Sequence, residues 1–280
     1  MIPANLTEHR AIEFTASQLA EAVTTCFEGY IMTFNIDGPG FERRFRPEGL
    51  DAQSSIILMD EHQPAAVCLI ARQGWTSRVA AMAIAPANRR QGVGQHLMHL
   101  VIEEAKHRGD HRLVLEVIEQ NPPAIGLYES VGMAKTRRLV GYLREPSQGT
   151  ASKIEIIDPS IVIRQQVIEC DHNLPWDYRP ETLSLKGTPM KGVTVDKEAY
   201  ALITDTMPER VIVWSLFTIR ECRNAGKAKN LVKAIAAMNP EKALVTPIAL
   251  PDDHAPGFMK SVGFNEVKIS QFEMAIELTQ

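Results

Sequence analysis

The spacing of apolar residues predicts alternating strands and helices in the first half of the chain. Apolar residues recur at helical spacing over residues 16–27 and 92–108, and the second run ends at Gly109. Short apolar runs between turn residues predict strands at 54–59, 64–72, 77–85, 112–118 and 138–143, with a short helix at 124–130. This order of strands and helices is typical of an α/β layer.

The second half of the chain repeats this order. Its pattern predicts strands at 200–204, 211–219, 243–248 and 268–278, with helical segments at 225–238 and before Ser261. Three sequence blocks recur in the same order, which predicts two copies of one fold. In the first block, a shift of 134 residues aligns Arg89, Gly92 and Gly94 with Arg223, Gly226 and Ala228. In the other two blocks, a shift of 131 residues aligns 113–115 with 244–246 and 131–133 with 262–264.

A stretch of small and helix-breaking residues separates the two copies. Residues 145–153 read Glu-Pro-Ser-Gln-Gly-Thr-Ala-Ser-Lys, and a chain of 280 residues is close to twice a usual domain. We therefore expect an α/β fold with two tandem domains, residues 1–146 and 154–280, joined by a linker at 147–153. Each domain is expected to hold a mixed sheet flanked by helices.

Composition and charge exclude several classes of protein. Hydrophobic residues make up 45% of the chain and charged residues 23%, as in an ordinary globular protein, and the net charge of −4 argues against a nucleic-acid partner. The apolar runs are too short to span a bilayer and the first residues lack a signal sequence, so we expect a cytoplasmic protein without a membrane partner. We expect either a monomer or a homodimer. The four cysteines are far apart and lack metal-ligand spacing, so we expect reduced thiols and no metal.

The segment between the strand at 77–85 and the long helix has the composition of an anion-binding loop. It reads Pro86-Ala-Asn-Arg89-Arg-Gln-Gly92-Val-Gly94-Gln95. Glycines at a strand-to-helix junction let backbone amides approach an anion, and the helix N-terminus favours negative charge. The loop lacks the spacing of a Walker or dinucleotide motif. Its spacing predicts a seat for a diphosphate, with a turn that binds no ligand as the alternative.

Several further motifs follow this loop in a fixed order. Leu115-Glu-Val117, Asn121 and Leu127-Tyr-Glu-Ser-Val-Gly132 come after it, and Ile84-Ala-Pro86 opens it. Together they resemble the acetyl-CoA-binding core of the GNAT N-acetyltransferase superfamily, most closely its ribosomal-protein-alanine N-acetyltransferase branch. The resemblance covers residues 54–140 strongly and, through the internal repeat, residues 200–278 weakly. It implies two tandem GNAT-like domains and acetyl-CoA as the cosubstrate.

The resemblance also implies where the cosubstrate binds. The backbone of Met82, Ala83 and Ile84 would hold the pantetheine arm, and Asn121 would bond the cosubstrate beyond the strand at 112–118. The loop would hold the pyrophosphate through Arg89, Arg90, Gln91, Gly92, Val93, Gly94 and Gln95.

Two side chains are candidates for proton transfer. An amine must lose a proton before it attacks a thioester, and Glu116 is the candidate base, with an ion pair to Arg112 or Arg137 as the alternative reading. The leaving thiolate accepts a proton, and Tyr128 is the candidate acid, with a packed helix aromatic as the alternative. Amides near Ala83 or Ile84 would meet the oxyanion. Because the sequence shows no nucleophile signature, we expect direct attack in a ternary complex.

The second copy departs from the pattern at these positions. Glu116, Asn121 and Tyr128 align with Pro247, Asp252 and Met259. We expect a degenerate domain that shapes the substrate wall or a subunit contact, with weak CoA binding as the alternative. We also expect long loops at 30–50 and 174–193. The first, with its aromatic and arginine residues, would form the acceptor wall or brace the domain interface.

The expected function is acetyl-CoA-dependent acetylation of a primary amine. The amine belongs to a small molecule or a peptide, and the motifs do not separate a protein N-terminus from a small-molecule or drug amine. A non-catalytic acyl-CoA sensor or scaffold is the alternative outside enzymes.

Overall fold

The computed structural model describes residues 5–32, 34–147, 153–170 and 173–278. The chain divides into two compact units, one formed by Met1–Arg137 with Phe272–Gln280 and the other by Arg138–Gln271. The predicted domains, residues 1–146 and 154–280, stay a prediction, because most of the linker at 147–153 lies outside the described residues.

The first unit is built on a mixed sheet. Its strands follow the spatial order β1 (Leu6–Arg10), β2 (Ile56–Asp60), β3 (Gln63–Gln73), β4 (Thr76–Ile84) and β5 (Arg112–Ile118). The sheet continues with the last residues of β13 (Asn265–Glu277) and the first residues of β6 (Ala134–Arg144). Neighbours along β1 to β4 are antiparallel, and β4 and β5 are parallel.

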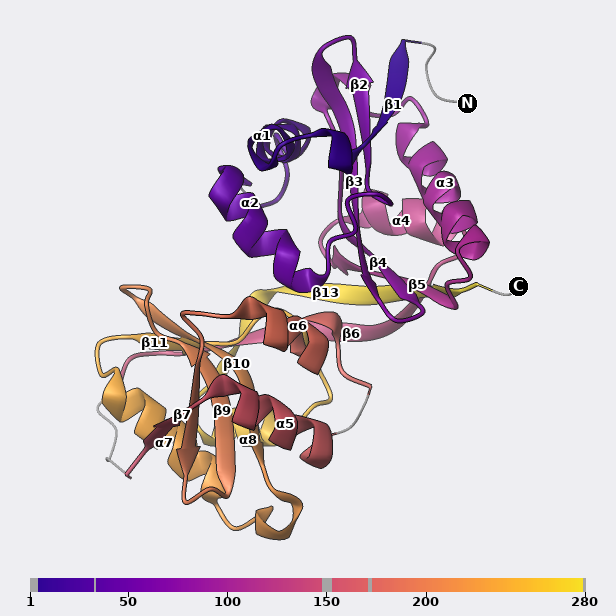
Figure 1. Cartoon of the computed structure of the whole chain (residues 1–280). Helices are drawn as coiled ribbons and strands as arrows, with labels where there is room; N and C mark the ends of the chain where they lie inside the picture. The colour runs from indigo at the N-terminus through magenta and orange to yellow at the C-terminus, as the bar shows by residue number, and fades with distance from the viewer. Residues whose placement is uncertain (1–4, 33, 148–152, 171–172, 279–280) are drawn as a thin grey trace. The chain divides into compact units, whose positions relative to one another are not determined.

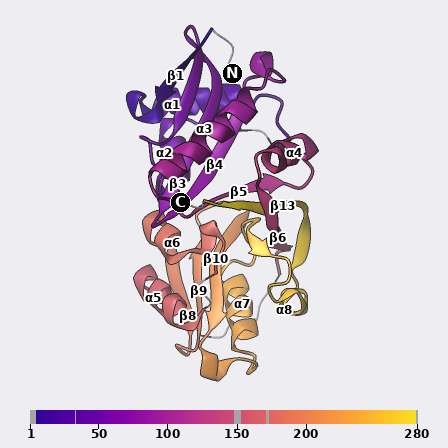
Figure 2. The ribbon, with the colours of Figure 1, turned by 90° about the vertical axis from the view of Figure 1, so that its right-hand side faces the viewer.

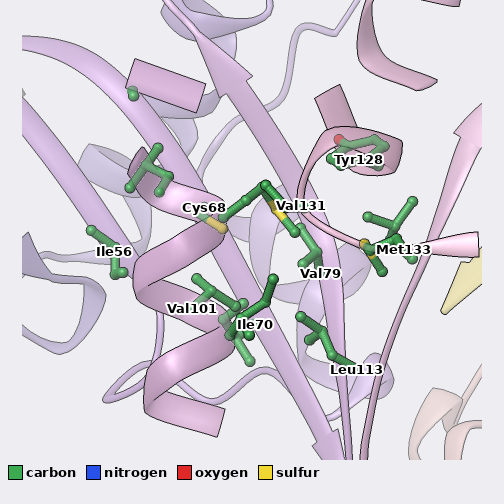
Figure 3. Close-up of a cluster of buried hydrophobic side chains, with 14 of the residues drawn as sticks. Ile56, Cys68, Ile70, Val79, Val101, Leu113, Tyr128, Val131 and Met133 are labelled. Atoms are coloured by element: carbon green, nitrogen blue, oxygen red, sulfur yellow. The ribbon is translucent and has the colours of Figure 1, made fainter. Parts of the chain in front are cut away.

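Two pairs of helices cover the two faces of this sheet (Figure 1). One face packs on α1 (Ala16–Cys26) and α2 (Gly38–Phe45), with Phe41 and Phe45 in its core. The other packs on α3 (Val93–His107) and α4 (Pro122–Ser130). Figure 3 shows part of this second core, where side chains of β3, β4, α3 and α4 meet. Short 3-10 turns lie at Ala11–Glu13, Arg46–Glu48 and Pro86–Asn88.

The expectation of a loop over residues 30–50 was wrong, because α2 occupies its centre. Asp37 caps this helix by accepting a hydrogen bond from the Gly40 amide at 2.7 Å, and a proline stands in its first turn. Phe41 and Phe45, four residues apart, lie on the same face and are buried. The loop expected at 174–193 likewise contains elements, the 3-10 turn Trp176–Tyr178, α6 (Pro180–Lys186) and the start of β8 (Lys191–Val195).

The second unit repeats the arrangement of the first. Its sheet follows the order β7 (Glu155–Ile157), β8, β9 (Ala199–Thr204), β10 (Arg210–Thr218) and β11 (Ala243–Val245), then the remaining parts of β6 and β13, with β12 (Leu250–Pro251) beside β6. The helices α5 (Pro159–Glu169) and α6 pack on one face, and α7 (Lys227–Met238) and α8 (Pro256–Ser261) on the other (Figure 2).

The strand registers of the two units agree with the internal repeat seen in the sequence. Thr76 pairs with Arg112 in the first unit, and Arg210 pairs with Ala243 in the second, the positions that the shifts of 134 and 131 align. The predicted strand at 243–248 ends earlier than expected, at Val245. There the amide of Thr246 bonds the carbonyl of Tyr142 at 2.9 Å, and Pro247 has no amide hydrogen to donate.

No helix in the described part of the chain has the length and apolar composition needed to cross a membrane.

The last residues of β13 complete the first unit. The amide of Leu278 donates to the carbonyl of His111 at 2.8 Å, and Arg137 bonds Glu273 at 2.7 Å. Met274 is fully buried in the core beneath α3 and α4, and Leu278 is buried there as well. A segment more than a hundred residues from β5 in sequence therefore supplies part of the first unit's core.

We expect Met274→Ala to lower the free energy of unfolding of the first unit by about 2–5 kcal/mol, the usual cost of truncating a buried methionine. The measurement is native-state hydrogen exchange of the β5 amides. Met207→Ala, at an exposed methionine of the second unit, is the control and should change the free energy of unfolding of the first unit by less than about 0.5 kcal/mol. Equal protection of β5 in both variants would contradict this role of β13.

Candidate active site

The parallel strands β4 and β5 part halfway along their length. Their pairing runs from Thr76 with Arg112 to Val79 with Leu115, while β4 continues to Ile84 and β5 to Ile118. At the point of parting, the register of β4 against β3 shifts, so that Ala80 is an extra residue on β4. Such a bulge bends its strand and increases the local twist. The end of β4 thus leaves β5 and opens the sheet between them.

The residues expected to hold the pantetheine arm lie at this opening. Met82, Ala83 and Ile84 form the end of β4 and pair with β3 on their other side, with Cys68 opposite Met82. All three are partly exposed. Their position beside the opening agrees with the expected role, which stays a prediction.

The loop after β4 presents unpaired backbone amides at the start of α3. The first hydrogen bond of the helix runs from the His96 amide to the Gly92 carbonyl at 3.0 Å, so the amides of Val93, Gly94 and Gln95 precede it. No side chain among the described residues caps this end. Gly92 has a φ of 79°, a left-handed conformation that glycine adopts without strain. The free amides and the helix dipole together favour the binding of an anion at the start of α3.

Gly94 lacks a side chain where α3 packs closely on its neighbours. A Cβ atom there would lie 3.0 Å from Leu127 of α4 and 3.1 Å from Ile84 of β4. The absence of a side chain lets α3 begin directly against β4 and α4. The loop is therefore fixed to the end of β4 by close packing.

Arg89 has a supporting position in the loop. Its guanidinium donates to the carbonyl of Ile84 at 2.8 Å and to the carbonyls of Cys26 and Glu28, at the end of α1. These bonds tie the loop to β4 and to α1. Arg90, with a φ of 63°, and Gln91 are exposed, and the Gln91 side chain donates to the carbonyl of Ala87 at 2.9 Å. Direct contacts of these side chains with a diphosphate stay a prediction.

Tyr128 lies on α4 with its ring in the core shared by α3, α4 and the sheet (Figure 3). It is 8% exposed. Burial raises the pKa of its phenol well above the ordinary value, and the Cys68 thiol and the Tyr30 phenol add to the rise. Like an ordinary tyrosine, Tyr128 is protonated at neutral pH and can donate a proton.

Glu116 lies on β5 in the first position after the paired segment. Its side chain is 9% exposed and forms an ion pair with Arg78 of β4, at 2.6 Å between the carboxylate and Arg78 Nε. The sequence suggested an ion pair to Arg112 or Arg137 and did not single out Arg78; Arg112 pairs with Glu277, and Arg137 pairs with Glu273. The parallel register pairs Arg78 with Val114, so Glu116 lies two residues further along the same face of β5, and sequence spacing could not reveal this.

Tyr128 and Glu116 belong to opposite faces of the sheet. Leu115 and Val117 point into the core that contains Tyr128, so strand alternation turns Glu116 toward α1 and α2. The two candidate proton-transfer groups can share one substrate only through the opening between β4 and β5. This geometry suits a reaction in which two substrates meet from the two faces.

Asn121 caps α4, and its side chain meets a residue that the motifs did not reveal. Its carbonyl oxygen accepts from the Ala124 amide at 3.4 Å, and its side chain hydrogen-bonds the Tyr30 phenol. Tyr30 follows α1 and packs edge-on against Phe27 at 5.1 Å. In the sequence, Tyr30 stood only as the first residue of the expected loop at 30–50.

A cavity of about 500 Å³ adjoins the start of the loop after β4, on the side of the end of α1. The end of α1, the turn between β2 and β3 and residues 85–88 line it, with carboxylates from Glu28, Asp60 and Glu61. None of the predicted site residues lines this cavity. Its negative charge makes it unsuited to a polyphosphate.

The second unit keeps the backbone of this site without its reactive side chains. Trp214 is the extra residue of a bulge in β10, Gly226 caps α7 at a φ of 77°, and Arg223 donates to the carbonyl of Glu169 at 2.6 Å. The positions of Glu116 and Tyr128 are taken by Pro247 and the buried Met259. Asp252, at the position of Asn121, is exposed and lies 3.8 Å from Arg138.

Residues 18–133, which contain this site, match the family model described as the acetyltransferase (GNAT) family. The chain is 30% identical over 110 residues to streptothricin acetyltransferase of Streptomyces lavendulae, a match that covers 39% of this chain and 56% of the relative. It is 45% identical over 51 residues to the ribosomal protein bS18-alanine N-acetyltransferase of Escherichia coli K12, covering 18% of this chain and 34% of the relative. The chain thus spans about half or less of these relatives.

The fold as a whole is similar to that of a tandem GNAT protein from the clavulanic acid biosynthesis pathway. The two superpose with a TM-score of 0.66 at 15% identity, over 98% of each chain. This likeness concerns the fold, and it agrees with the expected α/β architecture of two GNAT-like halves.

We expect Gly92→Glu to abolish acetyl-CoA binding, because the substitution strains the left-handed position and adds bulk and negative charge in front of the helix amides. Isothermal calorimetry measures the affinity. Gly74→Glu is the matched control, since Gly74 also has a positive φ and open space around it but lies in the turn between β3 and β4. An unchanged dissociation constant for Gly92→Glu would show that the diphosphate binds elsewhere.

Proposed function

Because the chain belongs to the GNAT acetyltransferase superfamily, we propose that its first unit transfers the acetyl group of acetyl-CoA to a primary amine by direct attack in a ternary complex. The observation that carries the proposal is the opening between β4 and β5, with a buried phenol on one face and a carboxylate on the other. The anion seat at the start of α3 lies at the end of the same strand.

The proposed reaction forms a C–N bond and breaks a C–S bond, and one proton is lost from nitrogen while one is gained by sulfur. The amine nitrogen attacks the thioester carbon, the C–N bond forms, and the tetrahedral intermediate collapses with loss of the C–S bond. The thioester would lie along Met82, Ala83 and Ile84, where strand amides stabilise the developing oxyanion. The amine proton passes to a base, and the sulfur takes up a proton, so the products are an acetamide and CoA.

Tyr128 is the proposed general acid. A tyrosine phenol is protonated at neutral pH, and burial raises the pKa of Tyr128 further, so the side chain has a proton to give to the leaving sulfur. The family motif Leu127-Tyr-Glu is the second support for this role.

Glu116 is the proposed base, acting directly or through water. Its position at the opening, on the face of α1 and α2, supports the role. Its ion pair with Arg78 means that the carboxylate accepts a proton against the attraction of a guanidinium. A water held by Glu116 would relay the proton without breaking that pair.

The acceptor is proposed to be a primary amine of a small molecule or a peptide. The names of the two relatives refer to streptothricin and to the alanine of ribosomal protein bS18. Release of CoA thiol from acetyl-CoA with a panel of alanyl peptides, streptothricin and simple amines tests the proposal. An acyl-CoA sensor would bind acetyl-CoA and release no thiol with any of them.

The second unit is proposed to be a degenerate copy with a supporting role. It keeps the loop backbone at Gly226 but has Pro247 and Met259 where the first unit has a carboxylate and a phenol. Acetyl-CoA saturation of the full chain at a stoichiometry of one, lost in Gly92→Glu, is the expected result for a single working copy.

We expect Tyr128→Phe to lower kcat about ten- to a thousandfold, within or near the range for a general acid, while acetyl-CoA affinity changes little. Steady-state kinetics and calorimetry measure the two quantities. Tyr142→Phe, which removes another buried phenol, controls for general effects of the lost hydroxyl. Turnover that survives in Tyr128→Phe would remove this residue from the mechanism.

We expect Cys68→Ala to keep kcat within about threefold of the wild type, because a protonated thiol is a poor nucleophile. Burial raises the pKa of the Cys68 thiol to about 12, so the thiolate is scarce at neutral pH. Single-turnover mass spectrometry after mixing with acetyl-CoA alone should detect no acetylated protein. A stable acetyl adduct on Cys68 would instead indicate a covalent intermediate.

A further inference from the structure

A chain of four alternating charges runs from the surface of α2 to the opening in the sheet. Arg44 of α2 pairs with Glu48, Glu48 pairs with Arg78 of β4 at 2.5 Å, and Arg78 pairs with Glu116 of β5 at 2.6 Å. Glu48 is fully buried, and the Arg78 side chain is 6% exposed. The guanidinium of Arg78 uses two different nitrogens, Nη1 for Glu48 and Nε for Glu116.

The chain of charges lies at the part of the sheet where chemistry is proposed. Arg78 comes two residues before the bulge at Ala80, and Glu116 directly after the last residue of β5 paired with β4. Arg78 therefore fixes a carboxylate that stands at the edge of the opening. The planar guanidinium holds both carboxylates in one geometry, whereas a lysine offers a single nitrogen.

The fold does not require these charges. In the second unit, β10 has the same register and the same bulge as β4, yet the residue at the position of Arg78 is Ile212. The residue at the position of Glu116 is Pro247. Buried ion pairs lose hydration that hydrophobic residues of similar size do not lose, so stability alone is a weak reason to keep them.

We infer that Arg78 is a positioning residue for acetyl transfer, which holds the Glu116 carboxylate at the opening and is itself anchored by the buried Glu48. This inference rests on the proposed function. It makes the 3-10 turn after α2, which carries Glu48, part of the catalytic apparatus, although that turn contributes no group to the reacting atoms.

A double-mutant cycle between Arg78 and Glu116 in the full chain tests the inference. The probe is the amine of the panel that the wild-type chain acetylates fastest. We expect E116Q to lower kcat/KM about a hundredfold, and R78M to lower it about tenfold in the wild-type background but less than about twofold in the E116Q background. The double variant R78M/E116Q removes one positive and one negative charge, so the net charge of the site is unchanged. Glu48 keeps Arg44 as a partner in this variant.

The KM for acetyl-CoA should stay within about twofold of wild type in all four proteins, since Arg78 lies outside the anion seat. R78K keeps the charge with one nitrogen and should recover part of the loss of R78M. It also replaces R78M in the cycle if R78M does not fold.

Arg72 supplies the matched control. It lies on β3 and bonds a fully buried carboxylate, Asp110, at 2.8 Å, in a cluster with Ser77 and Arg108. R72M should lower the Tm while leaving kcat/KM within about twofold of wild type.

Two results would overturn the inference. Equal losses from R78M in the wild-type and E116Q backgrounds, with the Tm lowered as in R72M, would show that Arg78 acts through stability and not through Glu116. A wild-type chain that releases no thiol with any amine would refute the proposed function itself, and this inference with it.

Discussion

The parting of β4 from β5 is the constraint on which the rest of the site depends. An extra residue at Ala80 bends β4 away from a neighbour with which it is still paired at Val79. The end of β4 then carries the chain into the loop at Gly92, whose amides open α3. One local irregularity in the ladder thus sets both the opening in the sheet and the direction of the anion seat.

The opening joins two environments of different character. On the side of α3 and α4, Tyr128 is surrounded by apolar side chains, and this low-polarity setting raises the pKa of its phenol. On the side of α1 and α2, Glu116 belongs to a series of paired charges. The proposed proton donor and the proposed base therefore lie on opposite faces of the sheet.

The second unit shows which of these features belong to the fold and which to the chemistry. It has the bulge at Trp214, the left-handed glycine at the start of α7 and the arginine bonded to a helix carbonyl. It lacks the carboxylate and the phenol at the matching positions. The backbone arrangement is thus stable without the reactive side chains, as expected when local strand and helix geometry is set by packing and backbone hydrogen bonds.

The sequence by itself determined the repeat and many of the regular elements, although not β1, α2 or α5. Hydrophobic periodicity placed α1, α3, β4 and β5 within one or two residues of their observed ends, because burial on one face imposes that period along the chain. The helix α2 was missed, although its cap at Asp37 and the pair Phe41 and Phe45 were readable, because glycine and proline at its start are typical of turns.

The tertiary structure alone decided which residues meet across long separations in sequence. The end of β13 enters the first unit, Arg78 pairs with Glu116, and Tyr30 meets Asn121. Motif spacing locates groups along one segment, whereas these contacts depend on strand order and register between segments. Register is fixed only when the faces of the sheet are buried together, and that is a property of the folded chain as a whole.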